Sequence, residues 1–294
     1  MTKTEGPEYK KLMEFLGDKR FDEDWIFRAQ PENEDLATTL ERACNGWDFG
    51  LKAAHDIEYM MVREFRRVYK GQDQTEVRED LLYCLSLLRH HFAPARLLDF
   101  TYSKYVGVYF GLECAYRGKK KKNGGTNSEA VRGFTIWCIN TKALEERLKC
   151  KYSNDPVFTE NYNKRGNLRT RGDKSFRELY MKGKYKLAIP ESPKYINERQ
   201  HLQQGLFLCP GDIKVSFMEN LLCAVGNGRS VKAIEKLTFK LKTCELKQVF
   251  LQFRRMNISR ESLFPGLDGL ASAMEYQTWF YNDLAPKIGE PKEW

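Results

Sequence analysis

The chain has 294 residues, of which 41% are hydrophobic and 13% aromatic, and it carries a formal net charge of +9. This length is near the upper limit for one hydrophobic core, and no linker rich in proline, glycine or serine divides it, so we expect a single domain over residues 1–294. No apolar run reaches the roughly 18 residues that a membrane helix needs, and residues 1–17 lack a signal-peptide pattern. These features argue against a membrane partner and favour a cytoplasmic protein.

The first third of the chain is predicted to be mainly helical. Residues 25–30 (WIFRAQ) are a short strand-like stretch. Residues 53–70 then place apolar side chains at helical spacing, namely Ile57, Met60, Met61, Phe65 and Val68. Residues 76–90 indicate a more buried helix, whose inward side chains are Leu81, Leu82, Leu85 and Leu88.

A loop and another helix follow. Residues 91–100 (HFAPARLLDF) are interrupted by Pro94 and are predicted to form a loop. Residues 103–116 have the pattern of a helix, with Val106, Tyr109, Phe110 and Cys114 on one side. Thr101 and Ser103 stand where N-caps belong, because their hydroxyls can accept hydrogen bonds from free backbone amides.

Residues 117–130 are predicted to form a basic loop, since Lys119–Lys122 are followed by asparagine and glycine. Two interpretations stay open: a solvated loop, or a patch that attracts an acidic or nucleic-acid partner. The other positive charges are scattered, and no basic stripe alternates with aromatic residues. Nucleic-acid binding is therefore a third option behind the two functions considered below.

Strand patterns are concentrated in the later part of the chain. Residues 131–140 (VRGFTIWCIN) are rich in β-branched and aromatic residues, and Asn140 or Thr141 then caps a helix. Residues 151–190 are a polar insert, either a long ordered loop or a partly mobile one. The remaining elements are predicted as a helix (INERQHLQQ), two short strands (LFLC and VKAIEKLTFKL) and two helices (CELKQVFLQFRRM, with Leu246, Val249, Phe250 and Phe253 inward, and LDGLASAMEYQTWF).

Helices that come first and strands that come later favour an α+β fold, because the regular βαβα alternation of a doubly wound sheet is missing. We expect a helix-rich N-terminal part packed on a small mixed or antiparallel sheet. The eight cysteines are widely spaced and include no CxxC pair, which predicts mostly buried free thiols and no metal site.

Four segments together resemble the FRG domain, over roughly residues 25–271. They are Trp25–Gln30 (WIFRAQ), His90–Phe110 (HHFAPARLLDFTYSKYVGVYF), Arg199–Phe207 (RQHLQQGLF) and Ser262–Leu270 (SLFPGLDGL). The departures are Ala29, Phe92 and Ala95, which replace an expected glycine, glycine and threonine, and Arg89 where glutamine is common. These changes restrict the backbone conformations that the loop can adopt, since only glycine adopts positive φ freely.

The resemblance implies a protein of bacteria or their phages. More remotely, the same pattern is similar to mono-ADP-ribosyltransferases. That second resemblance implies an ADP-ribosyltransferase-like fold, NAD as cofactor, and a defence or toxin activity on a macromolecular target. Similarity of fold alone does not establish chemistry.

On this resemblance, the predicted catalytic residues are Arg28, His90 and Gln203. The guanidinium of Arg28 grips the diphosphate of NAD, or alternatively pairs with a buried carboxylate such as Asp99. His90 donates to a ribose hydroxyl or acts as acid or base, or is an ordinary histidine at a helix end. Gln203 aligns with the catalytic glutamate but carries no charge, so the source of any catalytic carboxylate stays open.

The predicted cofactor-binding residues are Arg28, Gln30, His90, Thr101, Ser103 and Arg199. Thr101 and Ser103 brace the nicotinamide ribose or simply cap a helix, and Arg199 is structural or binds phosphate. Arg96 and Asp99 are predicted to form an ion pair that holds their loop, and SLFPGLDGL is read as architecture in which Leu267 and Leu270 pack.

Two functions from different classes follow. The first is an NAD-binding, ADP-ribosyltransferase-like enzyme. The alternative is a non-catalytic interaction or nucleotide-sensor module, in which Lys119–Lys122 contact an acidic partner.

Overall fold

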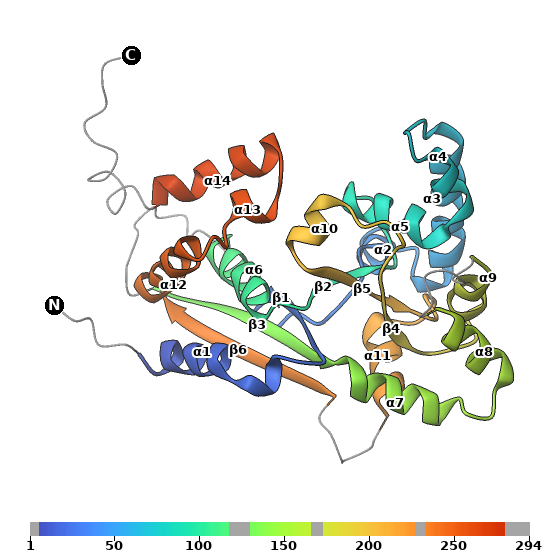
Figure 1. Ribbon diagram of the computed structural model, residues 1–294, viewed down its shortest axis with the longest axis horizontal. Coiled ribbons are helices and arrows are strands. Elements are labelled where there is room, and N and C mark those ends of the chain that lie inside the picture. Colours follow the sequence, from blue (N-terminus) through green and yellow to red (C-terminus); the bar gives the residue numbers. More distant parts are fainter. Residues whose placement is uncertain (1–5, 118–129, 166–172, 227–232, 280–294) are drawn as a thin grey trace.

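The computed structural model describes residues 6–117, 130–165, 173–226 and 233–279 (Figure 1). The basic run Lys119–Lys122 lies outside the described residues, so its role stays a prediction. Among the described residues, no helix is long and apolar enough to cross a bilayer.

A six-stranded sheet with the order β4-β5-β2-β1-β3-β6 runs through the molecule, and every neighbouring pair is antiparallel. Its strands are β1 (Trp25–Pro31), β2 (Leu98–Thr101), β3 (Val131–Asn140), β4 (Ala188–Glu191), β5 (Gly205–Pro210) and β6 (Ile234–Lys242). The sheet and the many helices confirm the α+β class. The ADP-ribosyltransferase-like arrangement stays a prediction.

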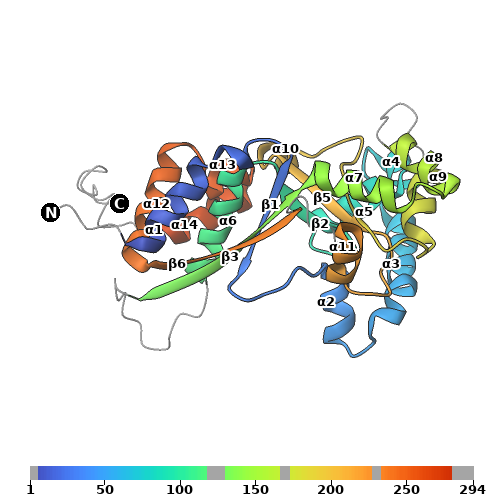
Figure 2. The ribbon, with the colours of Figure 1, turned by 90° about the horizontal axis from the view of Figure 1, so that it is seen from below.

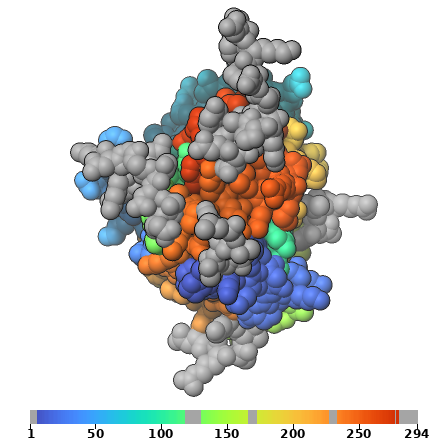
Figure 3. Space-filling model, turned by 90° about the vertical axis from the view of Figure 1, so that its left-hand side faces the viewer, coloured from blue at the N-terminus to red at the C-terminus, as the bar shows by residue number. Residues whose placement is uncertain are grey.

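The strands bury side chains on both faces, as their alternation requires. Ile26, Trp137 and Ile139 belong to one hydrophobic core, whereas Phe27 and Phe134 belong to the other. The second core gathers the apolar faces of α1 (Pro7–Gly17), α6 (Lys104–Arg117), α12 (Thr243–Arg255) and α14 (Leu267–Trp279), with α13 (Arg260–Leu263) and the 3₁₀ turn η1 (Lys19–Phe21) beside them. Figure 3 looks onto this end, where α1 is blue and α12 orange.

The remaining helices lie at the opposite end of the molecule, as Figures 1 and 2 agree. Most of them surround the other core, whereas Leu40, Cys44, Ala54 and Ile213 form a small third cluster. These helices are α2 (Thr39–Gly46), η2 (Leu51–Ala53), α3 (Ala54–Val68), α4 (Gln74–Glu79), α5 (Leu81–His90), α7 (Thr141–Lys151), α8 (Pro156–Arg165), α9 (Asp173–Phe176), the π-helical turn η3 (Arg177–Met181) and α11 (Phe217–Val225). The short helix α10 (Glu198–Leu202) lies between the two groups.

Two glycines allow α6 to lie directly on the sheet. A Cβ atom on Gly107 would be 2.8 Å from the Cβ of Phe27, and one on Gly111 would be 2.2 Å from the ring of Phe134. Real side chains cannot approach so closely, so only glycine permits this contact. The close contact brings Phe110 of α6 to the edge of the pocket described below.

Several local predictions are confirmed. The strand over 131–140 has the predicted bounds, and the side chain of Asn140 caps α7 by accepting from the amide of Ala143 at 2.8 Å. The predicted helix over 76–90 is divided into α4 and α5 at Asp80, whose carboxylate accepts from the amide of Tyr83 and caps α5.

The interpretation of 151–190 as a polar loop is wrong for its described residues, which contain α8, α9, η3 and β4. Aromatic residues spaced among the polar ones hold it: Phe158 stacks on Tyr162, and Phe176 lies against Tyr180. The prediction that Leu267 packs is also wrong, because 77% of its surface is exposed.

The C-terminal helix buries Ala273 and Tyr276, and Leu270 is likewise exposed. The inward face of α3 differs from the prediction too. Met60 and Val68 are exposed, whereas Glu58 and Val62 are buried. A buried glutamate breaks the apolar pattern on which the prediction relied, and its partner is described below.

Four of the eight cysteines are buried (Cys44, Cys84, Cys138 and Cys209), three are half-buried and Cys150 is exposed. Within the described ranges, no group of three or more histidine, cysteine, aspartate or glutamate residues is arranged to hold a metal ion.

Candidate functional site

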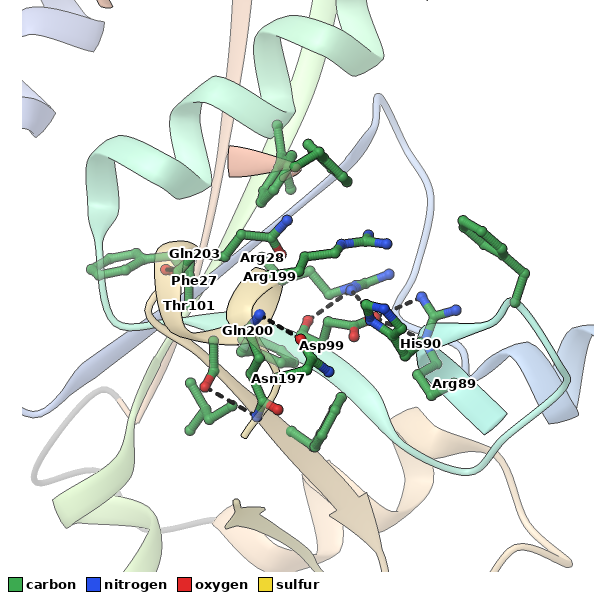
Figure 4. A pocket seen from close by; sticks show the side chains of 18 residues that line it. Phe27, Arg28, Arg89, His90, Asp99, Thr101, Asn197, Arg199, Gln200 and Gln203 are labelled. Carbon is green, nitrogen blue, oxygen red and sulfur yellow. Dashed lines mark hydrogen bonds and ion pairs between the residues drawn. The ribbon is translucent and has the colours of Figure 1, made fainter. Parts of the chain in front are cut away.

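A pocket of about 260 Å³ lies where β1, β2 and β5 meet the end of α5 and the helix α10 (Figure 4). Its lining combines six phenylalanines with three arginines and one carboxylate: Phe27, Phe92, Phe100, Phe110, Phe207, Phe264, Arg28, Arg89, Arg199 and Asp99. Aromatic rings and guanidinium groups around one hollow are the side chains that bind planar bases and phosphate oxygens.

Arg28 points into the pocket from β1. Its Nη1 donates to the carbonyl oxygen of Asp99 at 2.7 Å, and only 18% of its side chain is exposed. Burial lowers the pKa of Arg28 to about 10, although Asp99 opposes the shift, so the guanidinium stays charged at neutral pH. Its Nε is buried without a hydrogen-bond partner among the described residues. A ligand acceptor at this atom would satisfy it.

Asp99 of β2 is held between two cations. Its Oδ2 accepts from Nε and Nη2 of Arg89 at 2.9 and 2.6 Å, and lies 3.7 Å from Nη1 of Arg28. Arg28 therefore does pair with Asp99, as its alternative interpretation predicted, but this carboxylate is 44% exposed and is not buried. Because one carboxylate faces two arginines here, and Arg199 adds a third, the pocket carries a surplus of positive charge.

Arg199 lies on α10, which begins where the side chain of Asn197 accepts from the amide of Gln200 at 2.8 Å. The guanidinium of Arg199 lies 4.4 Å from the ring centroid of Phe264 and 5.9 Å from that of Phe92. Both rings lie within cation–π range of this guanidinium, and Phe264 is the nearer. Burial lowers the pKa of Arg199, which means that it is partly removed from water.

Thr101 and Gln203 join β2 to the end of α10. The Thr101 hydroxyl donates to the carbonyl oxygen of Gln203 at 2.7 Å and accepts from the amide of Ser103 at 3.0 Å. The side-chain Nε2 of Gln203 donates to the carbonyl oxygen of Leu263 at 3.0 Å. Both side chains line the pocket, but these polar groups are already engaged with the protein.

Ser103 does not line the pocket. Its Oγ accepts from the amide of Val106 at 3.3 Å and its carbonyl from that of Gly107, so it caps α6 as one of its two interpretations predicted. Gln30 also lies outside the lining. It is buried two residues beyond Arg28 on β1, and its Oε1 accepts from Arg42 at 3.5 Å.

His90 lines the pocket at the C-terminal end of α5, and its ring centroid is 4.9 Å from that of His91. Burial lowers the pKa of His90 below its ordinary value of 6.5, and Arg199 and His91 lower it further, against the opposing effect of Asp99. The imidazole is therefore neutral at pH 7. Figure 4 shows His90 beside Asp99 and Arg199.

The predicted ion pair between Arg96 and Asp99 is wrong. Arg96 is fully buried and bonds to the carboxylate of Glu58 on α3, with its Nε 2.9 Å from both oxygens. Its Nη1 also donates to the carbonyl oxygen of Tyr180 at 2.6 Å. Arg96 lies in a bend before β2, and its guanidinium is directed to Glu58, whereas Asp99 lies on the strand and pairs with Arg89.

The lining residues that had no predicted role at a site include Arg89, Asn197, Gln200 and Phe264. Gln200 has a buried Oε1 without a partner among the described residues, and its amide donates to the carbonyl oxygen of Gly205 at 3.3 Å. A sequence signal did exist for Phe92, since it replaces an expected glycine. Its φ is +65°, and its ring is 79% exposed at the edge of the pocket.

Backbone strain of this kind in a bulky residue is uncommon and is concentrated at functional sites. The structure thus brings together Arg28, His90, Thr101, Arg199 and Gln203, as predicted from distant parts of the sequence, and leaves Ser103 and Gln30 outside.

Comparison with known proteins gave one match. No curated protein and no solved structure matches the chain. The matched segment contains β1, α5 and β2, and so contributes Arg28, Arg89, His90, Asp99 and Thr101 to the pocket, whereas α10 lies beyond it. This segment, residues 23–122, matches the family model of the FRG domain.

Proposed function

We propose that this pocket binds the diphosphate-bearing half of NAD or of a related ADP-ribose nucleotide. The observation that carries the proposal is the cationic cluster of Arg28, Arg89 and Arg199 around the single carboxylate of Asp99. Guanidinium groups match the oxygens of a diphosphate in geometry as well as in charge. The buried, unpartnered Nε of Arg28 adds a donor that is already oriented.

The size of the pocket supports occupation by part of a dinucleotide. Its volume of about 260 Å³ is just below the range of about 300–1,000 Å³ that is usual for small-molecule sites. One nucleotide half would fill it, and the other half would extend past the exposed ring of Phe92. Stacking on Phe92 or Phe264 would then hold a base or nicotinamide ring.

The geometry favours binding over catalysis, so a nucleotide-sensing module is the function supported best. When bound, NAD would supply an activated glycosidic bond, and breaking that bond calls for a carboxylate near the ribose. Among the described lining residues, Asp99 is the only carboxylate, and Arg89 and Arg28 already contact it. The Gln203 side chain instead donates to the carbonyl of Leu263.

ADP-ribosyl transfer is the second candidate, and the exposure of Asp99 favours it. The side chain of Asp99 is 44% exposed although it is paired, so one of its oxygens is accessible from the pocket. In this role Asp99 would orient a ribose hydroxyl, and the target would be a macromolecule.

Calorimetric titration of the full chain with NAD, ADP-ribose and adenosine tests the binding proposal. We expect NAD and ADP-ribose to bind with similar affinity and adenosine much more weakly, because it lacks the diphosphate. Arg199→Ala should weaken both nucleotides, whereas Arg255→Ala, which removes an exposed arginine of α12, is the matched control. Equal binding by the two variants would contradict the proposal.

Chromatographic detection of nicotinamide, with and without cell extract, separates the two candidates. A sensor binds NAD and releases no nicotinamide. If nicotinamide is released, Asp99→Asn should abolish the release while NAD still binds, because the substitution removes a negative charge that repels phosphate.

A further inference from the structure

A second cavity, of about 600 Å³, lies between α3, the start of α5 and the π-helical turn η3. It shares no lining residue with the pocket around Arg28. Its walls carry five arginines, which are Arg63, Arg66, Arg67, Arg78 and Arg177. Among the lining residues, these five arginines face a single carboxylate, that of Glu58.

The charges around this cavity do not balance. Arg63 and Arg67 share the carboxylate of Glu64, each at 2.9 Å, and Arg177 pairs with Asp173. Glu58 is already neutralised by the buried Arg96.

Arg66 and Arg78 have no ion-pair partner among the described residues. The Nε of Arg66 donates to the carbonyl oxygen of Val77 at 2.9 Å, which fixes its side chain. The cavity is therefore surrounded by more positive than negative charge, and an anion would be attracted to it.

The arrangement of the arginines is imposed by the helix. Tyr59, Arg63 and Arg66 or Arg67 follow one another at spacings of three or four residues, so they form one face of α3. Arg78 faces them from the end of α4, and Arg177 from η3. Three of the five arginine side chains are about half or more exposed: Arg63 at 56%, Arg67 at 71% and Arg177 at 48%.

The floor between the arginines is apolar. Val62 and Leu81 are buried there, Met181 borders it, and the ring of Tyr59 is 59% exposed at the rim. An apolar floor inside a ring of cations suits a ligand with an aromatic body and several anionic oxygens. The volume of about 600 Å³ is within the range that is usual for small-molecule sites, so it suits a small molecule.

We propose that this cavity is a second, independent site that binds a nucleoside polyphosphate. Its phosphates lie among Arg63, Arg67, Arg78 and Arg177, and its base lies on the floor beside Tyr59. The proposal does not rest on the function of the pocket around Arg28, because separate residues form the two sites.

Calorimetric titration with ATP tests the site. It is performed in the Arg199→Ala background, so that binding at the other pocket contributes little. Within that background, Arg63→Ala with Arg78→Ala should weaken ATP binding by about tenfold or more, because each guanidinium contributes charge-assisted hydrogen bonds. Arg255→Ala in the same background is the control and should leave the affinity unchanged.

Equal affinities of the Arg63/Arg78 variant and the Arg255 control for ATP would overturn the proposal, as would the absence of any ATP binding. Arg63 and Arg78 are exposed, so their replacement should leave the chain folded, and a thermal unfolding scan of the unliganded variants checks this. Loss of NAD binding in Arg199→Ala, with ATP binding kept, identifies the two sites as distinct.

The chemistry of the ligand is tested with two simpler probes. Inorganic triphosphate carries the charge without the base, and adenosine carries the base without the charge. We expect ATP to bind more tightly than either probe. Tyr59→Ala should lower the affinity for ATP until it is close to the affinity for triphosphate. Adenosine that binds as tightly as ATP would overturn the role of the arginines, and triphosphate that does so would overturn the role of the apolar floor.

Discussion

The two arginine-lined hollows of this protein differ in how their charges are held. Arg28 and Arg89 are 18% and 19% exposed, and both contact Asp99 on a strand of the sheet. Arg63 and Arg67 are 56% and 71% exposed, and they contact a neighbour on their own helix. In the first hollow the cations are desolvated and ordered when the chain folds. In the second, solvent screens them until a ligand arrives.

The difference teaches that similar residue composition can give sites of different character. Buried and oriented guanidinium groups favour selectivity for one ligand shape, because they cannot rearrange to suit another. Exposed guanidinium groups give attraction that depends strongly on salt. The predictions below test this contrast, beginning with the largest expected effect.

The buried ion pair between Arg96 and Glu58 borders the second hollow, since Glu58 is part of its lining. Arg96→Met should lower the free energy of unfolding by about 3–5 kcal/mol, because it leaves Glu58 buried and unpaired. Urea denaturation measures this. Arg96→Met combined with Glu58→Leu should recover part of the loss, and a double variant no more stable than the single one would contradict the explanation.

Arg199→Ala should weaken NAD binding by about tenfold to a hundredfold, because it removes a charged donor held between two rings. The loss should persist at high salt, whereas ATP binding at the second cavity should fall steeply as salt rises. Calorimetry at two ionic strengths measures both. Equal salt dependence at the two sites would contradict the proposed difference between buried and exposed guanidinium groups.

The affinity for NAD should rise by a few-fold as the pH falls toward the lowered pKa of His90. Burial lowers the pKa of His90, and the positive charges of Arg199 and His91 lower it further, whereas the negative charge of Asp99 raises it. A bound diphosphate raises that pKa, so binding takes up a proton in the window between the two values.

Without ligand the sign is opposite. A lowered pKa in the folded state means that the unfolded chain binds the proton more readily, so stability falls as the pH drops below 6.5. His90→Gln removes both effects, and a pH profile of affinity that is the same in wild type and variant would contradict this role.

Phe92→Asn should raise the free energy of unfolding by about 1 kcal/mol, because asparagine tolerates the left-handed backbone that phenylalanine adopts at φ +65°. The same change removes a ring that lies 5.9 Å from the Arg199 guanidinium and borders the pocket, so NAD affinity should fall. Chemical denaturation and calorimetry measure the two effects. Loss of both stability and affinity would mean that the exposed ring stabilises the fold.

The smallest effect is expected at the rim of the second cavity. Arg63→Ala should change the free energy of unfolding by less than about 0.5 kcal/mol, since exposed ion pairs contribute little. Urea denaturation beside Arg96→Met makes the comparison direct, and a larger loss would show that the rim arginines stabilise the fold.

Local patterns predicted the fold well where a single element determines its own form. Alternation identified the strand over 131–140, and the Asn140 cap was visible as well. The prediction of the inward face of α3 was wrong because the charge of Glu58 argued for an exposed position. Its true position depends on Arg96, which arrives from a different part of the chain, and no local pattern contains that information.

The candidate site was predicted in part for the same reason. Arg28, His90, Thr101, Arg199 and Gln203 were identified by resemblance to known motifs, and the pocket unites them. The pairing of Asp99 with Arg89 was not predicted, because proximity in sequence favoured Arg96. The actual partners come from other elements, Arg89 from α5 for Asp99 and Glu58 from α3 for Arg96, and no local pattern identifies them.

The strand order has a consequence for anyone who trims this protein to the family match. Residues 23–122 include β1 and β2, which occupy the middle of the sheet, while β3 and β5 on either side of them lie outside the match. A fragment cut at those limits would keep a two-stranded ribbon with both edges bare, and bare edges join those of other molecules. It should precipitate on expression, whereas a fragment that spans residues 6–279 keeps every neighbour in the sheet.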